Sequence, residues 1–294
     1  MAAPEAEVEL GADLVRALLL EQHPDLAHLP IVPVASGWDN VVFRLGDHLA
    51  VRLPRRAMGA ALAVHEQRWL PELAPGLPLP VPAPVRVGAP GRVYRWPWSV
   101  VPWFHGEEAA RADPLDWMDT AERLASFLVA LHRPAPPDAP VNPLRGRPLG
   151  ERTSRLVAGL DELGDLVDRR RVEALWADLV ATEAWDGPPL WLHGDLHPRN
   201  LIVDRGRLAA VVDFGDLTAG DPATDLSVAW FWLPAPAREV FRDVLGDVDD
   251  STWRRAKGWA LALAVAHLGG DEHVIPLGRH ALEAVLADGT PSPT

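Results

Sequence analysis

The stretch from residue 190 to residue 215 constrains the fold more than any other part of the chain. It contains three short apolar runs, which alternate with polar loops; they are residues 190–193, 201–204 and 208–213. Short runs rich in β-branched residues, bounded by turn formers, are typical of strands. A turn at Arg205 and Gly206 would pair the second run with the third. The sequence therefore predicts a small β-hairpin at this point.

Three polar side chains mark the ends of these predicted strands. Asp195 lies in the loop after the first run, Asn200 precedes the second run, and Asp213 ends the third. Pairing of the second and third runs would bring Asn200 and Asp213 side by side. A carboxylate and an amide oxygen are suitable ligands for Mg²⁺. With Asp195 free to orient a hydroxyl and accept its proton, the set suits phosphoryl transfer.

The part of the chain before residue 104 reads as a β-rich lobe. Five apolar runs predict an antiparallel sheet, and residues 57–73 predict a helix in the same lobe. The runs are residues 31–35, 41–45, 49–53, 85–88 and 92–101. A further helix is expected over residues 8–21, and the segment 102–107 is a candidate hinge. We therefore expect an N-terminal nucleotide-binding lobe over residues 1–103.

The remainder of the chain, residues 104–294, reads as a mostly helical lobe around the small β insert. Residues 115–132 carry a clear apolar stripe at helical spacing. Residues 152–183 predict one or two more helices, and helices return from about residue 222. Residues 134–148 are rich in proline and arginine and read as a loop. The expected fold class is α+β, with two lobes like those of a protein kinase.

Composition excludes several classes of function. The chain has no cysteine, so disulfides, thiolate metal sites and cysteine nucleophiles are ruled out. Its formal net charge of −13 argues against a nucleic-acid partner, which requires clustered Lys and Arg. The N-terminal residues lack the features of a signal peptide, and the most apolar later stretch is far shorter than the ~20 residues of a membrane span. We expect a soluble cytoplasmic protein, with a monomer as the default.

Several segments together resemble the aminoglycoside phosphotransferase family of antibiotic and small-molecule kinases. They are His193-Gly-Asp195, Asp213-Phe-Gly-Asp216, Gly220-Asp-Pro-Ala-Thr-Asp-Leu226 and the LxxLH that ends at His132. The resemblance covers nearly the whole chain, and the joint match is highly specific, although each segment alone is weak. It implies that Asp195 is the catalytic base and that Asn200 and Asp213 hold Mg²⁺. It also implies structural roles for His193 and for Asp225, which would support the catalytic loop.

The resemblance also suggests how ATP or GTP would be bound. The loop from Ser36 through Gly37 to Asn40 matches the loop that covers the phosphates, although a plain hairpin turn is the competing interpretation. Where this fold usually has a lysine, the chain has Arg52, which keeps the charge in a longer, planar group. Its expected partner is Glu66, with Glu72 second.

The purine should lie against the hinge. Backbone groups around Val101 would bond the edge of the purine, with Ile202 packing beneath the ring. This assignment rests on the resemblance, and it does not distinguish ATP from GTP.

Position alone suggests some side chains for the acceptor site. Asp216, Asp271 and Glu272 could meet the ammonium groups of a cationic acceptor, although solvated surface charges are the simpler interpretation. Trp230 and Trp232 could line a pocket, although a place in the helical core is favoured.

The leading hypothesis is a kinase that phosphorylates a hydroxyl of an aminoglycoside-like or other antibiotic-like small molecule. The alternatives are a macrolide kinase, a kinase of an endogenous amino alcohol or sugar derivative, and a nucleotide-binding pseudokinase. The last is supported only by Arg52 in place of lysine.

Overall fold

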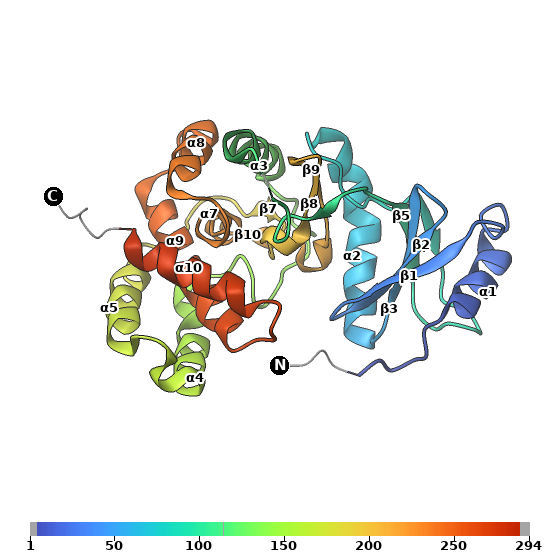
Figure 1. Cartoon of the computed structure of the whole chain (residues 1–294), viewed down its shortest axis with the longest axis horizontal. Coiled ribbons are helices and arrows are strands. Elements are labelled where there is room, and N and C mark those ends of the chain that lie inside the picture. Colours follow the sequence, from blue (N-terminus) through green and yellow to red (C-terminus); the bar gives the residue numbers. More distant parts are fainter. Residues whose placement is uncertain (1–4, 114, 289–294) are drawn as a thin grey trace. The chain divides into compact units, whose positions relative to one another are not determined.

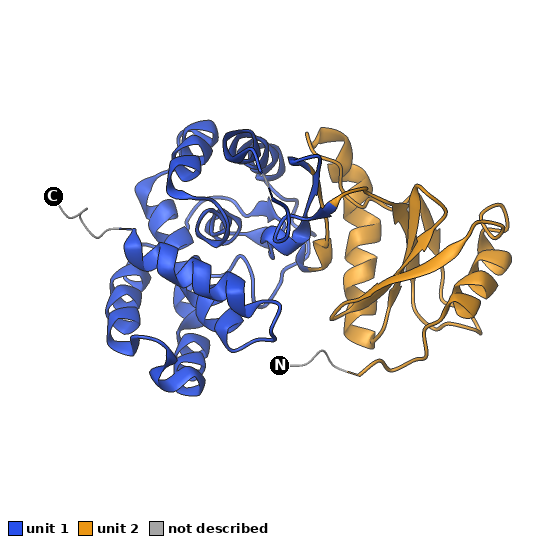
Figure 2. Cartoon of the chain, viewed as in Figure 1, with its two compact units in different colours: residues 1–2, 107–208, 216–294 blue, residues 3–106, 209–215 orange. Residues whose placement is uncertain are grey.

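The computed structural model describes residues 5–113 and 115–288. The first four residues of the N-terminal segment considered above, and the last six of the predicted helical lobe, lie outside this range. The chain forms two compact units (Figure 2). Unit 2 consists of residues 3–106 and 209–215, and unit 1 consists of residues 107–208 and 216–294, with residues 1 and 2.

Unit 2 is built on a five-stranded antiparallel sheet, as the sequence predicts. The strand order is β1-β2-β3-β5-β4. The strands are β1 (Ile31–Ser36), β2 (Asn40–Leu45), β3 (Leu49–Pro54), β4 (Arg86–Gly88) and β5 (Trp98–Pro102). Two helices accompany the sheet, α1 (Ala12–Gln22) and α2 (Ala57–Leu73) (Figure 1).

The core of unit 2 forms where α1 meets the sheet. Leu18 and Leu19 of α1 are fully buried in one cluster with Val51, Trp98 and other side chains of the strands. Burial of such side chains provides about 1.5–3 kcal/mol each. The apolar alternation along β2 and β3 therefore fixes which face of the sheet meets the helix.

One predicted strand of this sheet is shorter than expected. The sequence predicts a strand over residues 92–101, but β5 begins only at Trp98. Pro97 has no N–H to donate to a ladder. Tyr94 turns into the core instead, where its hydroxyl donates a hydrogen bond to the carbonyl of Pro54.

Unit 1 is mostly helical. The longer helices are α3 (Trp117–Leu131), α4 (Thr153–Leu163), α5 (Arg169–Val180), α8 (Ala235–Leu245), α9 (Asp250–Leu268) and α10 (Ile275–Ala287). Helix α9 is the centre of this unit, because α10, α4, α5 and the short α6 (Ala223–Leu226) all pack against it (Figure 1). Asp249 fixes the start of α9 by accepting a hydrogen bond from the amide of Thr252 at 2.7 Å.

The β insert of unit 1 contains the predicted hairpin. Strands β8 (Leu201–Asp204) and β9 (Arg207–Val211) are neighbours in a three-stranded sheet whose other strand is β6 (Glu107–Glu108). Arg205 and Gly206 both have positive φ at the turn, which is the conformation that tight hairpins require. The chain passes from unit 1 to unit 2 within β9.

The first run of the insert pairs elsewhere. Strand β7 (Leu190–Leu192) joins β10 (Thr218–Gly220) in a separate antiparallel pair. The third run also ends earlier than predicted. Strand β9 stops at Val211, and Asp213 lies beyond it with φ of +62°, a left-handed conformation that no strand continues.

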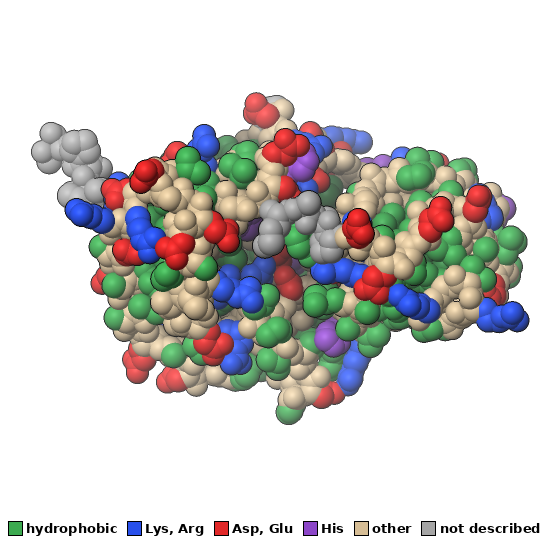
Figure 3. Space-filling view, turned by 90° about the horizontal axis from the view of Figure 1, so that it is seen from below, with side chains coloured by type: hydrophobic (Ala, Val, Ile, Leu, Met, Phe, Trp, Pro, Cys, Tyr) green, Lys and Arg blue, Asp and Glu red, His purple; other side chains and the backbone are tan. Residues whose placement is uncertain are grey.

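No helix within residues 5–113 and 115–288 combines the length and the apolar character that crossing a bilayer requires. On the face shown in Figure 3, acidic and basic side chains are interspersed with hydrophobic ones.

Candidate active site

The loop that carries Asp195 is held from beneath by a buried carboxylate. Asp225 of α6 is fully buried and accepts hydrogen bonds from the amides of His193 at 2.8 Å and Gly194 at 2.9 Å. The ring of His132, at the end of α3, lies 3.2 Å from the same carboxylate. Three of the motifs singled out in the sequence therefore meet at one point. The support of the loop by Asp225 is confirmed.

Gly194 is required by the close approach of the backbone at this loop. Its φ is +87°, and a Cβ atom here would lie 2.2 Å from the carbonyl oxygen of Asp216. A residue with a side chain would have both an unfavourable backbone and a clash. The buried ring of His193 completes the turn, because its Nδ1 accepts from the amide of Asp195 at 3.2 Å.

Asp195 itself is partly exposed and has two cationic or polar neighbours. Its side chain is 29% exposed, with Oδ1 2.7 Å from Nη2 of Arg145 and Oδ2 3.4 Å from Nε2 of His197. Burial alone raises the pKa of this carboxyl group. The guanidinium of Arg145 and the imidazole of His197 outweigh burial and hold the pKa of Asp195 well below its ordinary value. The group is therefore a carboxylate at neutral pH.

Arg145 is a residue of the site that the sequence analysis missed. It lies in the loop 134–148, and its Nε is 3.5 Å from Oδ2 of Asp216, so the guanidinium stands between two carboxylates. Burial lowers the pKa of Arg145, but Asp195 and Asp216 outweigh it and raise the pKa overall. Local sequence gives no sign of this contact, because the partners are 50 and 71 positions away.

The backbone beside Arg145 is fixed against the motif 220–226. Gly146, with φ of +65°, donates to the hydroxyl of Thr224 at 3.1 Å and accepts from the amide of Asp221 at 3.1 Å. A Cβ atom on Gly220 would lie 2.3 Å from the carbonyl oxygen of Gly146. The two glycines thus allow the loop to contact the motif directly, which places Arg145 against Asp195.

Asn200 is buried at the end of a short turn that follows Asp195. Its side-chain amide nitrogen, Nδ2, donates to the carbonyl oxygen of Asp195 at 2.8 Å. This bond turns the amide so that the nitrogen faces the loop, which leaves the amide oxygen available as a ligand. His197 caps the same turn by accepting from the amide of Arg199 at 3.3 Å.

Asp213 belongs to unit 2, where it lies near Arg52 of β3. Arg52 pairs with Glu66 of α2 through Nη1 and Oε2 at 2.9 Å, and its Nη2 lies 3.4 Å from Oδ1 of Asp213. Glu66 is the partner that the sequence favours over Glu72. Burial raises the pKa of Glu66 to about 6, with Arg52 opposing the rise. Burial lowers the pKa of Arg52, but Glu66 and Asp213 raise it overall.

The predicted phosphate loop is tied to the end of β3. The hydroxyl of Ser36 and the carbonyl of Gly37 both accept from Nη1 of Arg55, at 3.0 Å and 2.8 Å. The amide of Gly37 already donates to the carbonyl of Asn40 at 2.9 Å. One of the backbone donors expected to face the phosphates is therefore engaged within the loop itself.

The two residues expected around the purine belong to different units. Val101 of β5 pairs with Ala50 of β3, whereas the pairing of β4 with β5 covers only residues 98–100. Among residues 5–113 and 115–288, one edge of the backbone at Val101 thus has no strand beside it. Ile202 lies in β8 of unit 1, where it pairs with Glu108 and is half-buried.

The expected acceptor residues divide into buried and exposed groups. Asp216 accepts from the amide nitrogen of Asn142 at 2.6 Å and lies beside Arg145, so it is built into the loop rather than solvated. The side chain of Glu272 is 87% exposed. Trp230 and Trp232 are buried, as the favoured interpretation predicts.

A histidine of α9 lies beside His197 and was not anticipated from the sequence. The ring of His267 in α9 lies 5.8 Å from that of His197 and 5.1 Å from that of Phe231. Burial lowers the pKa of His267, which keeps the ring neutral.

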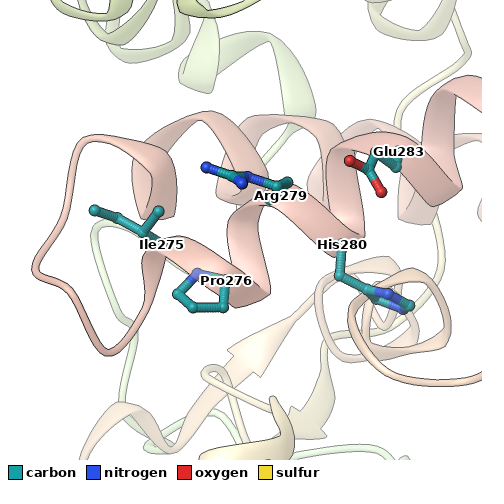
Figure 4. A pocket seen from close by; sticks show the side chains of 5 residues that line it. All are labelled: Ile275, Pro276, Arg279, His280 and Glu283. Carbon is teal, nitrogen blue, oxygen red and sulfur yellow. The ribbon is translucent and has the colours of Figure 1, made fainter.

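Elsewhere, a hollow along α10 is lined by Ile275, Pro276, Arg279, His280 and Glu283 (Figure 4). All five come from that single helix, and none is a predicted site residue.

The residue types present fit Mg²⁺. Asn200 offers an amide oxygen, and Asp213 offers a carboxylate that is 58% exposed. Within the described part of the chain, no three His, Asp or Glu side chains gather into a metal site. Mg²⁺ does not require such a cluster, because it takes few protein ligands and completes its shell with water and substrate phosphates.

Comparison with known proteins identifies a family for this chain. Residues 30–259 match the sequence model of the phosphotransferase enzyme family. The chain is 31% identical over 112 residues to an aminoglycoside 3'-phosphotransferase of Escherichia coli, a stretch that covers 37% of this chain and 41% of the relative. The match thus spans about two fifths of the relative's length.

Solved structures share the fold over almost the whole chain. The GDP complex of aminoglycoside 2'-phosphotransferase-IIIa superposes with a TM-score of 0.72 at 19% identity, covering 96% of this chain and 100% of that chain. Macrolide 2'-phosphotransferase MphH from Brachybacterium faecium gives a TM-score of 0.61 at 22% identity, covering 96% and 99%. The match of residues 30–259 spans most of the sequence, including every motif described above, and the chain therefore belongs to the phosphotransferase enzyme family.

Proposed function

We propose that the chain is a kinase that transfers the terminal phosphoryl group of ATP or GTP to a hydroxyl group of a small molecule. The observation that supports this most is the rigid loop around Asp195, an ionised and partly exposed carboxylate held through Asp225. Asp195 orients the acceptor hydroxyl. As the new O–P bond forms and the bond to the β-phosphate oxygen breaks, Asp195 takes the hydroxyl proton and later releases it to solvent.

Asn200 and Asp213 are the proposed ligands of Mg²⁺. Mg²⁺, when bound, neutralises charge on the phosphate oxygens. The hydrogen bond from Asn200 to the carbonyl of Asp195 supports this role, because it turns the amide oxygen away from the loop. Asp213, with its left-handed backbone, lies past the end of β9 with its carboxylate largely exposed.

Arg52, Val101, Ile202 and the loop 36–40 are the proposed nucleotide contacts. The Arg52–Glu66 pair supports the first of these, because it holds the guanidinium extended at the position where a phosphate-binding cation is expected. Val101 would use the open backbone edge of β5, and Ile202 would pack under the purine.

Two classes of acceptor deserve testing. An aminoglycoside-like or macrolide-like antibiotic is suggested by the names of the similar proteins. An endogenous hydroxylated metabolite, such as an amino alcohol or sugar derivative, is the second class. One observation argues against a polycationic acceptor. Arg145 places a cation against Asp195 at 2.7 Å, so such an acceptor would meet a like charge at the point of reaction, and an uncharged sugar derivative would not.

The test is nucleotide turnover with Mg²⁺ and either ATP or GTP, using a panel of aminoglycosides, macrolides, amino alcohols and sugar derivatives. We expect one acceptor class to stimulate turnover. Asp195→Ala should lower kcat by at least about 10²-fold while the melting temperature stays within a few degrees. Unchanged kcat in that variant would remove Asp195 from its role. Tight nucleotide binding without turnover on any acceptor would favour a pseudokinase.

A further inference from the structure

Arg152 is a buried arginine without an anionic partner. It ends the short turn Leu149–Arg152 in unit 1, and it is 6% exposed. Its guanidinium carbon lies 5.4 Å from the ring centroid of Trp259 in α9, which is fully buried. Within residues 5–113 and 115–288, Arg152 has no ion-pair partner and no hydrogen-bond acceptor. Burying an unpaired charge is costly, and stacking on an aromatic ring offsets only part of that cost.

Two groups here are donors that lack acceptors. Nε of Arg152 and Nε1 of Trp259 are buried, and neither has a hydrogen-bond partner in the described part of the chain. Nε of Arg145 also makes no hydrogen bond there, although a carboxylate oxygen of Asp216 lies 3.5 Å from it. Native proteins rarely leave such groups unpaired unless a ligand or water completes them. Because Arg152 and Trp259 offer N–H donors and Arg152 carries a positive charge, an anion rich in acceptor oxygens would complete them.

A second arginine connects this region to the proposed base through its charge. Arg145, four residues before the start of the turn that Arg152 ends, donates to Asp195 at 2.7 Å. Burial lowers the pKa of Arg152 to about 10, and the positive charges of Arg145 and Arg155 add to this effect. The charges of the two arginines differ in their partners. Asp195 and Asp216 compensate the charge of Arg145, whereas the charge of Arg152 is uncompensated within the described residues.

We infer that the acceptor of this kinase is a hydroxylated anion, a molecule that carries a carboxylate or phosphate group beside the hydroxyl to be phosphorylated. Arg152 binds that anionic group through its guanidinium, while Arg145 contacts the proposed base. This inference rests on the proposed kinase function and names its substrate class. Carboxylate and phosphate share the required chemistry, and the experiment below distinguishes them.

Anion binding is measured first, without any need for turnover. The full chain, saturated with Mg-ADP so that the donor site is filled, is titrated by calorimetry with inorganic phosphate and separately with glycerate. Glycerol at the same concentration and chloride at the same ionic strength are the controls. We expect saturable binding of at least one anion, and Arg152→Met should weaken it by about ten- to hundredfold. Arg155→Met removes the same charge from an exposed position three residues along and should leave binding unchanged.

The thermal stability of the variant separates a ligand-binding role from a structural one. Without added anion, Arg152→Met should unfold at the same temperature as the wild type or higher, because it removes an unpaired buried charge. Phosphate or glycerate should raise the melting temperature of the wild type but not that of Arg152→Met. Arg152→Lys keeps the charge and should recover part of the rise.

Turnover with matched acceptors completes the test. Glycerate is compared with glycerol, galacturonate with galactose, and ribose 5-phosphate with ribose. We expect the anionic member of a pair to be preferred, with its KM raised about ten- to hundredfold in Arg152→Met and the KM for nucleotide unchanged. Turnover only on neutral or cationic acceptors overturns the inference while the kinase stands. Absence of Arg152-dependent binding of both anions overturns it as well. No turnover on any acceptor, with Arg152-dependent anion binding intact, overturns the kinase proposal instead.

Discussion

Arg145 sets the protonation state of Asp195, and Arg145→Met tests this. Nη2 of Arg145 lies 2.7 Å from Oδ1 of Asp195, whose side chain is 29% exposed. An opposite charge this close typically lowers the pKa of an aspartate by about 1–3 units, which corresponds to about 1.4–4 kcal/mol. In the variant that effect disappears, while burial, which raises the pKa of Asp195, and His197, which lowers it, both remain. The carboxyl group should therefore titrate at a higher pH than in the wild type.

The sign of the pH dependence follows from this. In the wild type the folded-state pKa of Asp195 is depressed, so its stabilising contribution is present above pH ~4 and is lost as pH falls through the folded value. In Arg145→Met that contribution is lost. The unfolding free energy of the variant should therefore rise less steeply with pH below about pH 4. The acid limb of kcat/KM should therefore lie at a higher pH in the variant than in the wild type.

The assay is kcat/KM between pH 4.5 and pH 8 at saturating Mg-nucleotide, with slow nucleotide hydrolysis as the readout if no acceptor is available. Arg147→Met is the control, because Arg147 is 41% exposed and forms an ion pair with the exposed Glu151. Equally flat profiles for wild type and Arg145→Met would refute the reasoning. An acid limb that appears in both arginine variants would attribute the effect to general charge rather than to the contact with Asp195.

Two other substitutions test the supports of the site. Gly194→Ala puts a Cβ atom 2.2 Å from a carbonyl oxygen at φ of +87°. Because backbone strain of about 1–2 kcal/mol must move the loop, we expect kcat to fall at least about tenfold with the KM for nucleotide unchanged. Wild-type kinetics would contradict this. Arg52→Met leaves Glu66 buried without its cation, so it should lower the unfolding free energy by about 3–5 kcal/mol, measured by denaturant unfolding. It should also weaken nucleotide binding, measured by nucleotide titration. Recovery in Arg52→Lys would assign the loss to the charge, and unchanged nucleotide affinity in Arg52→Met would remove Arg52 from the nucleotide site.

The sequence predicts the fold well where the pattern is local. The five strands of unit 2, the helix over residues 57–73 and the hairpin turn at Arg205 and Gly206 each depend on runs of neighbouring residues, and each is present. The errors lie at ends, where long-range packing decides. The run 92–101 is apolar enough for a strand, yet Tyr94 buries its ring in the core and the ladder begins only after Pro97.

The candidate site was only partly predictable for the same reason. Asp195, Asn200 and Asp213 are recognisable because they lie within one short stretch of sequence. Arg145 lies in a proline-rich loop without periodic pattern, and long-range contacts of that loop, such as the close approach of Gly146 to Gly220, bring it to Asp195. Arg152 and Trp259 are separated by more than a hundred residues. No local signal marks such pairs, because the contact depends on how the loop after α3 packs against α9.

The net charge of the whole chain is a poor guide to the charge of its acceptor. A value of −13 suggests attraction for cations, and the face in Figure 3 bears acidic side chains among basic ones. Exposed charges are screened over roughly 8–10 Å in physiological salt, so they influence approach more than binding. At the proposed base the nearest cation is Arg145, whose side chain is only 15% exposed, and salt screens such a charge far less. Arg145 neutralises part of the field of Asp195 and Asp216, and Arg152 adds a positive charge that no carboxylate of the described chain offsets. An acceptor selected by these contacts is an anion, even on a strongly acidic protein.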